Sequence, residues 1–143
     1  MSAIKYKFKF LNDLTSDVMF EAYGQDLKEV FENAAEALFN VICQIDKIEP
    51  KQEIEITVNG RNSEDLMFNW LQELILIVDT ENMFFSKFEI KEIKEDGTYL
   101  KAVCYGEPAS PEKGGTLVKA VTYYKFKLEK TKGGYKVRVA LDI

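Results

Sequence analysis

The sequence predicts an α+β fold, in which two main helices pack on a mostly antiparallel or mixed β-sheet within a single compact domain, residues 1–143. Two patterns indicate this class. Several segments alternate apolar with polar residues, as strands with one buried face do. Two other segments repeat apolar residues every three or four positions, as amphipathic helices do. Strands and helices that do not alternate regularly along the chain are typical of α+β proteins.

The N-terminal elements follow from local patterns. Residues 4–10 alternate aromatic or aliphatic side chains with lysines, which predicts a half-buried strand. After a polar, turn-rich segment, residues 18–23 are expected to be extended. Asp26 followed three residues later by Glu29 has the form of a capping box. Apolar residues at helical spacing then predict a helix over residues 27–43.

The middle of the chain repeats this order. Residues 54–58 alternate apolar with polar side chains, which predicts a strand. Residues 59–63 are expected to end this strand and to provide a helix N-cap. A broad apolar stripe over residues 66–78, which includes Trp70, predicts a second helix packed against a sheet. These apolar side chains, Trp70 included, are expected to belong to the core.

The remaining strands form two predicted hairpins, residues 84–93 with 98–105 and residues 118–129 with 135–143. Gly97 is free to adopt the positive φ that a tight turn requires. Residues 131–134 form the turn of the last hairpin. Residues 106–115 are rich in Pro and Gly, and we expect them to form a mobile loop.

The charge of the chain bears on whether it binds nucleic acid. The net charge is −5 and the pI is about 4.9. A protein that binds nucleic acid without a partner normally has a basic face. Local basic clusters do occur, at Lys5, Lys7 and Lys9 and at Lys125, Lys127, Lys130 and Lys132. We favour solvated strand faces that discourage edge pairing over RNA contact for both clusters. Strong independent nucleic-acid binding is therefore not expected.

Membrane insertion and secretion are not expected either. No apolar run approaches the roughly 20 residues that a membrane span needs. Cys43 and Cys104 are isolated on apolar segments, which favours buried, reduced thiols in a cytoplasmic protein. A disulfide between them is the alternative.

The end of the sequence contains a candidate metal site. Residues 137–143 alternate as a strand, so Asp142 and the α-carboxylate of Ile143 would be held close together. Two anionic groups at such a short distance repel each other, and a divalent cation or a lysine relieves the repulsion. Oxygen ligands without His or Cys favour Ca²⁺, Mg²⁺ or Mn²⁺. Asp17 and Lys119 are candidates to complete the site.

The expected register of the last hairpin places Thr122 opposite Asp142. Lys119 would then lie roughly 10 Å along the strand from that position. Structural interpretations compete with each assignment: Asp17 as a turn residue, Asp142 as a solvated charge and Lys119 as an exposed strand residue. Likewise, Thr122 could be a cross-strand packing residue, and Glu107 could support only a loop turn.

Motifs spread over the chain resemble those of the archease family. They are Thr15-Ser16-Asp17-Val18, Ala22-Tyr23-Gly24, Leu27-x-Glu29-x-x-Glu32-Asn33-Ala34-Ala35, Trp70-Leu71-x-Glu73-Leu74, Gly106-Glu107-Pro108, Val118-Lys119-Ala120-Val121-Thr122-Tyr123 and Leu141-Asp142-Ile143. The resemblance implies that Asp17, Lys119 and Asp142 match family site residues and that an acidic metal site includes the two carboxylates. The family commonly has histidines where this chain has Leu14 and Tyr124, and this sequence contains none.

The resemblance also implies a function. Archeases are cofactors of the GTP-dependent RNA ligase that joins tRNA halves, so the leading hypothesis is a non-enzymatic activator that promotes guanylylation and repeated turnover of that ligase. Lys119, Thr122 and Glu107 would contact the partner, its nucleotide or RNA. One alternative is a chaperone-like modulator of a tRNA methyltransferase. Another is a small metal-dependent enzyme that acts on phosphate esters.

Overall fold

The computed structural model describes residues 6–12 and 17–143. The first two residues of the predicted strand 4–10 and most of the turn-rich segment lie outside these ranges. The elements in chain order are β1 (Phe8–Leu11), β2 (Val18–Gly24), α1 (Leu27–Ile42), η1 (Ile45–Lys47), β3 (Gln52–Asn59), α2 (Ser63–Glu81), β4 (Met83–Ile93), β5 (Tyr99–Pro108), η2 (Pro111–Lys113), β6 (Ala120–Thr131) and β7 (Gly134–Asp142).

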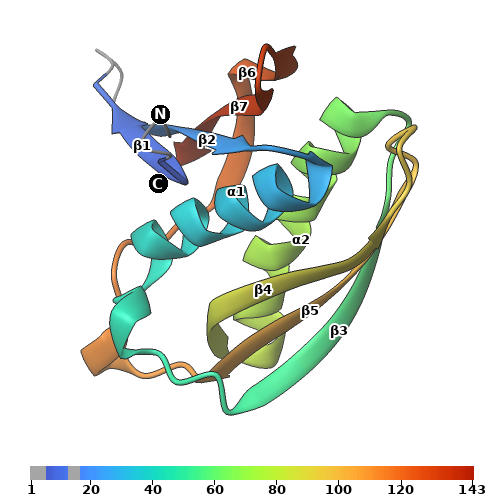
Figure 1. Cartoon of the computed structure of the whole chain (residues 1–143). Helices are drawn as coiled ribbons and strands as arrows, with labels where there is room; N and C mark the ends of the chain where they lie inside the picture. The colour runs from blue at the N-terminus through green and yellow to red at the C-terminus, as the bar shows by residue number, and fades with distance from the viewer. Residues whose placement is uncertain (1–5, 13–16) are drawn as a thin grey trace.

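The strands form two antiparallel sheets, with the orders β1-β2-β7-β6 and β3-β5-β4. Helix α1 packs against β2 of the first sheet and β4 of the second, while α2 packs against β6 and β3. The helices therefore lie between the sheets (Figure 1). The predicted α+β class is confirmed, but the strands divide between two sheets where the sequence suggested one. Alternation identifies a strand without identifying its partner.

Both helices begin at the side chains that the sequence indicated. The Asp26 carboxylate accepts a hydrogen bond from the Glu29 N–H at 2.9 Å, and the Glu29 carboxylate accepts one from the Gln25 N–H at 2.7 Å. At α2, the Asn62 side chain accepts a hydrogen bond from the Asp65 N–H at 2.9 Å. These bonds satisfy N–H groups that the first helical turn leaves unpaired.

A contiguous apolar core joins both sheets to the helices. Trp70 is fully buried at its centre, and its indole N–H donates to the Phe31 carbonyl at 3.0 Å. Phe39 of α1 packs on Phe85 and Phe88 of β4, which shows why the buried face of this helix is broader than the predicted stripe.

Both cysteines are buried free thiols, as the sequence led us to expect. Burial raises the pKa of the Cys43 and Cys104 thiols to about 12, because an apolar environment disfavours the thiolate. These thiols therefore remain protonated and unreactive at neutral pH.

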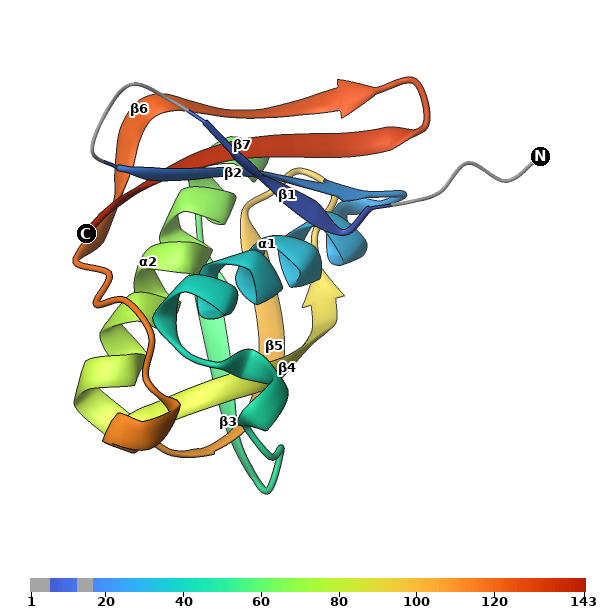
Figure 2. The same cartoon turned by 90° about the vertical axis from the view of Figure 1, so that its left-hand side faces the viewer.

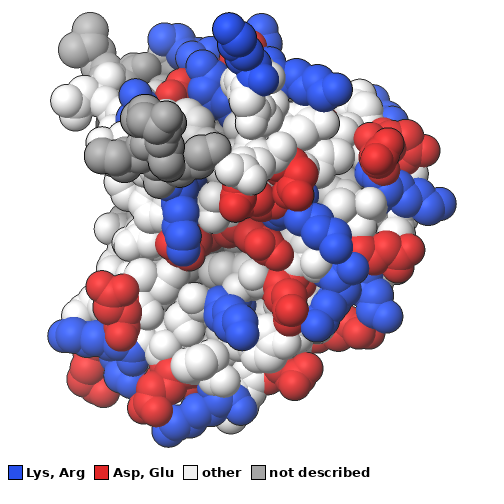
Figure 3. All heavy atoms as spheres, in the orientation of Figure 1, with Lys and Arg blue, Asp and Glu red and all other residues white. Residues whose placement is uncertain are grey.

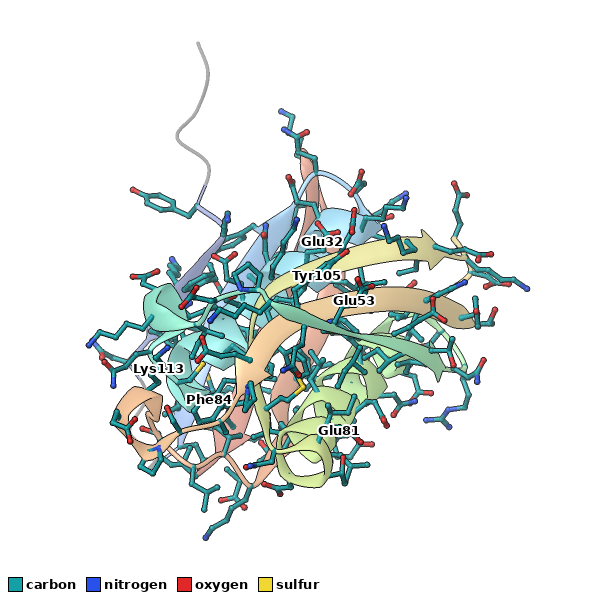
Figure 4. The ribbon with its side chains drawn as sticks, turned by 90° about the horizontal axis from the view of Figure 1, so that it is seen from below. Glu32, Glu53, Glu81, Phe84, Tyr105 and Lys113 are labelled. Carbon is teal, nitrogen blue, oxygen red and sulfur yellow. The ribbon has the colours of Figure 1, made fainter. Side chains whose placement is uncertain are left out.

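Helix side chains bind the free edges of two strands. The Gln72 side-chain oxygen accepts from the Val121 N–H at 2.6 Å, and the Glu64 carboxylate accepts from the Leu128 N–H at 2.9 Å, both on edge strand β6. On edge strand β4, the Ile90 N–H donates to Glu32 at 2.8 Å; Figure 4 shows Glu32 beside this strand. These bonds fasten each sheet to a helix and occupy backbone groups that could otherwise pair with another chain.

Two predictions of the fold were wrong in detail. Tyr6 and Phe10 are 65% and 47% exposed, so the first strand is less buried than its alternation indicated. It lies at the edge of its sheet, where the neighbouring layer covers less of it.

The expected loop at residues 106–115 is largely ordered by hydrogen bonds. Its first three residues belong to β5, and residues 111–113 form η2. The Gln44 side-chain amide donates to the Glu112 carbonyl at 2.8 Å, and the Gly115 N–H donates to the Ile42 carbonyl at 2.9 Å. Pro and Gly content indicated an irregular segment but did not reveal these attachments.

Candidate functional site

Strand β7 brings the candidate residues together because it pairs with β2 on one side and β6 on the other. On the β2 side the last register pair is Val18 with Leu141. Asp17 precedes Val18 and Asp142 follows Leu141, so the two acidic residues occupy the next opposed positions. Figure 2 shows the start of β2, the start of β6 and the C-terminus at the same end of the sheet.

The register also sets the direction of these side chains. Residues opposed in an antiparallel pair project from the same face of the sheet. Val18 and Leu141 face the core, so Asp17 and Asp142, one position further on, belong to the outer face. Both are partly exposed. The site is therefore accessible to a second molecule.

Lys119 lies immediately beside Asp142. It precedes β6, and its backbone N–H donates to the Asp142 carbonyl at 2.7 Å. Its side chain is exposed, so its ammonium is available at the end of the sheet that carries the two carboxylates. The sequence placed Lys119 within a strand, whereas in the structure it precedes β6. It lies closer to Asp142 than the sequence predicted.

The predicted register was wrong. Asp142 is opposite Ala120, and Thr122 is opposite Ala140. The cause is a bulge in β6: five steps from Thr122 to Lys127 correspond to two steps from Ala140 to Arg138. Counting back from the hairpin turn cannot detect the three extra residues. Thr122 still belongs to the outer face, two positions along β6 from the residue opposite Asp142.

Glu107 is placed elsewhere, on β5 of the other sheet. Its carboxylate accepts hydrogen bonds from the Glu49 N–H at 2.7 Å and from the Lys113 ammonium at 2.9 Å. These partners, the Glu49 N–H first, lower the pKa of Glu107 below its ordinary value. Its bonds hold η2 and the chain before β3, which matches the structural interpretation of this residue.

The donor set at the end of β7 suits a hard divalent cation with few protein ligands. It consists of the Asp17 and Asp142 carboxylates, both oxygen donors. Across residues 6–12 and 17–143, no group of three or more His, Cys, Asp or Glu side chains is placed to hold a metal ion. Mg²⁺ is commonly held by one or two carboxylates, with waters and substrate phosphates completing its shell. The residues present fit an ion that is shared with another molecule.

Sequence reasoning did not identify Gln72 as part of the support for this site. Its bond to the Val121 N–H fixes β6 two residues after Lys119 and directly opposite Leu141. A polar residue beside the apolar stripe of a helix is usually solvated, so the sequence contained no signal for this contact.

Comparisons with known proteins identify the family of this chain. The chain matches the Archease protein family (MTH1598/TM1083) over residues 8–143. It is 42% identical over 141 residues to protein archease of Methanosarcina mazei, covering 96% of each chain. It is 44% identical over 123 residues to protein archease of Pyrococcus abyssi, covering 84% of this chain and 87% of that one. The chain belongs to the archease family.

Solved structures share the fold. The solution structure of Methanobacterium thermoautotrophicum protein 1598 is 37% identical, with a TM-score of 0.81, and the match covers 96% of this chain and 99% of that chain. The crystal structure of a Thermotoga maritima protein, described as an archease and possible chaperone, has a TM-score of 0.63 at 23% identity, with 100% and 97% covered. That second likeness concerns the fold alone. In the described part of the chain, no helix is long and apolar enough to cross a membrane.

Proposed function

We propose that this protein is a non-enzymatic activator of the GTP-dependent RNA ligase that joins tRNA halves, and that it promotes guanylylation and repeated turnover of the ligase. The observation that carries the proposal is the convergence of Asp17, Asp142 and Lys119 at one end of a sheet. Two independent strand pairings, β2 with β7 and β6 with β7, produce it. Membership of the archease family supports the same role.

The chemistry of the site suits a phosphoryl transfer carried out by a partner. Such transfers depend on positioning and on neutralisation of charge around the transferring group. Asp17 and Asp142, with the Ile143 carboxylate adjoining, would hold Mg²⁺, Mn²⁺ or Ca²⁺, which supplies positive charge to a phosphate when bound. Lys119 is exposed beside Asp142 and would contact a phosphate of the nucleotide or RNA directly.

The decisive measurement is single-turnover guanylylation of the ligase with labelled GTP, in the presence of wild-type, Lys119→Ala or Asp142→Ala protein. We expect both variants to stimulate the ligase less than the wild type does. Lys119 is exposed, so its loss should change stability by less than about 0.5 kcal/mol. Glu95→Ala and Lys94→Ala are matched controls, because both residues are exposed in the β4–β5 turn of the other sheet.

Equal guanylylation rates with all five folded proteins would remove Lys119 and Asp142 from the mechanism. Turnover of a phosphate ester by the isolated protein, lost in Asp142→Ala, would favour the enzyme hypothesis instead. Prevention of tRNA methyltransferase aggregation, without any effect on the ligase, would favour the chaperone-like role.

A further inference from the structure

The outer face of the β1-β2-β7-β6 sheet carries a row of charges. In this row Lys9 is opposite Glu21, Glu21 is opposite Arg138, and Arg138 is opposite Lys127. Opposed residues share a face, so three cations and one carboxylate follow one another across all four strands. Like charges opposed in a sheet, as at Arg138 and Lys127, reduce its stability. The pairs of Glu21 with Lys9 and with Arg138 are of opposite charge and favour the sheet, so only the Arg138–Lys127 pair needs a reason other than folding.

The β6–β7 hairpin concentrates positive charge in an acidic protein. Residues 125–138 contain six Lys and Arg side chains and one Glu, a net charge of +5, whereas the whole chain carries −5. Figure 3 shows Lys and Arg side chains gathered at the top of the molecule, over this hairpin, with acidic side chains more frequent below. Lys and Arg side chains also lie among acidic ones elsewhere on this view, but at this end they have few acidic neighbours.

Three of the six cations have no ion pair among the described residues. Lys136 lies 3.8 Å from Glu129, but among the described residues Lys127, Lys130 and Lys132 form no ion pair. Arg138 donates from Nε to the Lys125 carbonyl at 3.1 Å, which positions its guanidinium beside the bulge. Its remaining N–H groups are suited to a phosphate.

Exposed aromatic rings accompany the cations. The bulge between Thr122 and Lys127 carries Tyr123 and Tyr124, which are 73% and 41% exposed. The Lys125 ammonium lies 5.3 Å from the Tyr124 ring centroid. Cationic side chains next to exposed rings are typical of surfaces that bind single-stranded nucleic acid, where the backbone meets the charges and a base stacks on the ring.

A protein partner suits this face less well. The centres of protein interfaces are depleted of Lys and enriched in Trp, Tyr and Arg, whereas five of the six cations of this hairpin are Lys. The apolar positions of the outer face next to the charged row, Met19 and Ala140, are 3% and 0% exposed and offer no anchor. The surface that this face presents to a partner therefore consists of charged side chains and exposed tyrosine rings.

The charged row and the candidate site share strand β7. Arg138 and Asp142 are four residues apart on the same face, which corresponds to about 13 Å. We propose that this outer face binds single-stranded RNA, with Arg138 and Lys127 on its phosphates and Tyr124 beneath a base, so that the strand continues toward the Asp17–Asp142 end. This inference rests on the proposed function and names the RNA-binding surface that the activator adds to the ligase complex.

The test measures RNA affinity of the complex, because the isolated chain is acidic overall. The probe is a fluorescein-labelled 12-nucleotide single-stranded RNA of mixed sequence, titrated with ligase saturated by this protein, between 50 and 300 mM salt. Each phosphate contact on a single strand contributes a slope of about 0.7 in log K against log salt, which is roughly 5-fold in affinity at 0.1 M. Lys127→Ala/Arg138→Ala should reduce the slope by about 1.4 and the affinity roughly 25-fold.

Two further variants test the effects of charge at another surface and of base stacking. Lys94→Ala/Lys101→Ala removes the same charge from the other sheet and should leave both quantities at their wild-type values. Tyr124→Leu should weaken binding roughly 5-fold or more without altering the salt slope, because it removes stacking and no charge. Thermal melting confirms that each variant is folded.

An unchanged slope and affinity in Lys127→Ala/Arg138→Ala would overturn the inference. So would loss of co-sedimentation of this variant with the ligase in the absence of RNA, since the face would then bind an acidic protein surface. Guanylylation stimulated by the wild-type protein needs no RNA and tests the proposed function separately.

Discussion

The bond between Gln72 and edge strand β6 offers a sharp test of how the candidate site is supported. Gln72→Met keeps the length of the side chain and the helix propensity of the residue but removes the oxygen that accepts from the Val121 N–H at 2.6 Å. Val121 is buried, so its N–H would be left without a partner or solvent. Such a loss costs roughly 1–3 kcal/mol.

For a chain of this size, about 2 kcal/mol corresponds to a fall in Tm of roughly 6–8 °C. Gln72→Glu is the matched control, because it retains an acceptor oxygen at the same position and should lose much less. Urea denaturation and thermal melting of the three proteins decide the matter. A Gln72→Met protein within 0.5 kcal/mol of wild type, or equal losses in both variants, would refute the assignment of this bond as a fastening of β6.

Further predictions concern the pH response, a turn and the metal site. Burial, the largest cause, raises the pKa of Glu32 above its ordinary value, so its contribution to stability is complete at acidic pH and declines as pH rises through the raised pKa. Glu32→Gln should therefore become more stable relative to wild type between pH 4.5 and pH 7 in urea denaturation; a constant difference would contradict this. Gly97 has φ +76° and lies against the backbone at the start of α2, so Gly97→Ala should cost at least about 1 kcal/mol, and an unchanged Tm would count against it. Calorimetric titration with Mg²⁺, Mn²⁺ or Ca²⁺ should give weak binding that Asp17→Ala and Asp142→Ala abolish; unchanged binding in both would exclude these ligands. A C-terminal extension after Ile143 should impair ligase activation where an N-terminal tag does not, and full activation by the extended protein would show that the terminal carboxylate is incidental.

Local signals in the sequence predicted the elements well, because each depends on neighbouring residues. Asp26 identified the start of α1, and Gly97 identified the turn between β4 and β5. The grouping of strands into two sheets could not be predicted in this way, since alternation is the same whichever strand lies alongside. The edge-strand bonds of Glu32 and Gln72 were missed for a similar reason: their partners are distant in sequence.

The candidate site likewise combines residues that local sequence signals identify with contacts that they do not predict. The sequence singled out Asp142 from its charge and its place on a strand, but only the resemblance connected it to Asp17. The pairing of β2 with β7 supplies that connection. The distance between Lys119 and Asp142 depended on the bulge after Thr122, which no turn rule predicts.

The central position of β7 has a consequence for how the protein is made. Strand β7 follows every other element in the chain, yet it lies between β2, near residue 20, and β6. Pairing β2 with β7 closes a loop of more than a hundred residues, an ordering step that slows folding. Until β7 has been synthesised, the chain has β1 and β2 without the strand that joins them to β6. The Asp17–Asp142 end can therefore arise only after synthesis has passed residue 142, and truncated chains would present none of it to a partner.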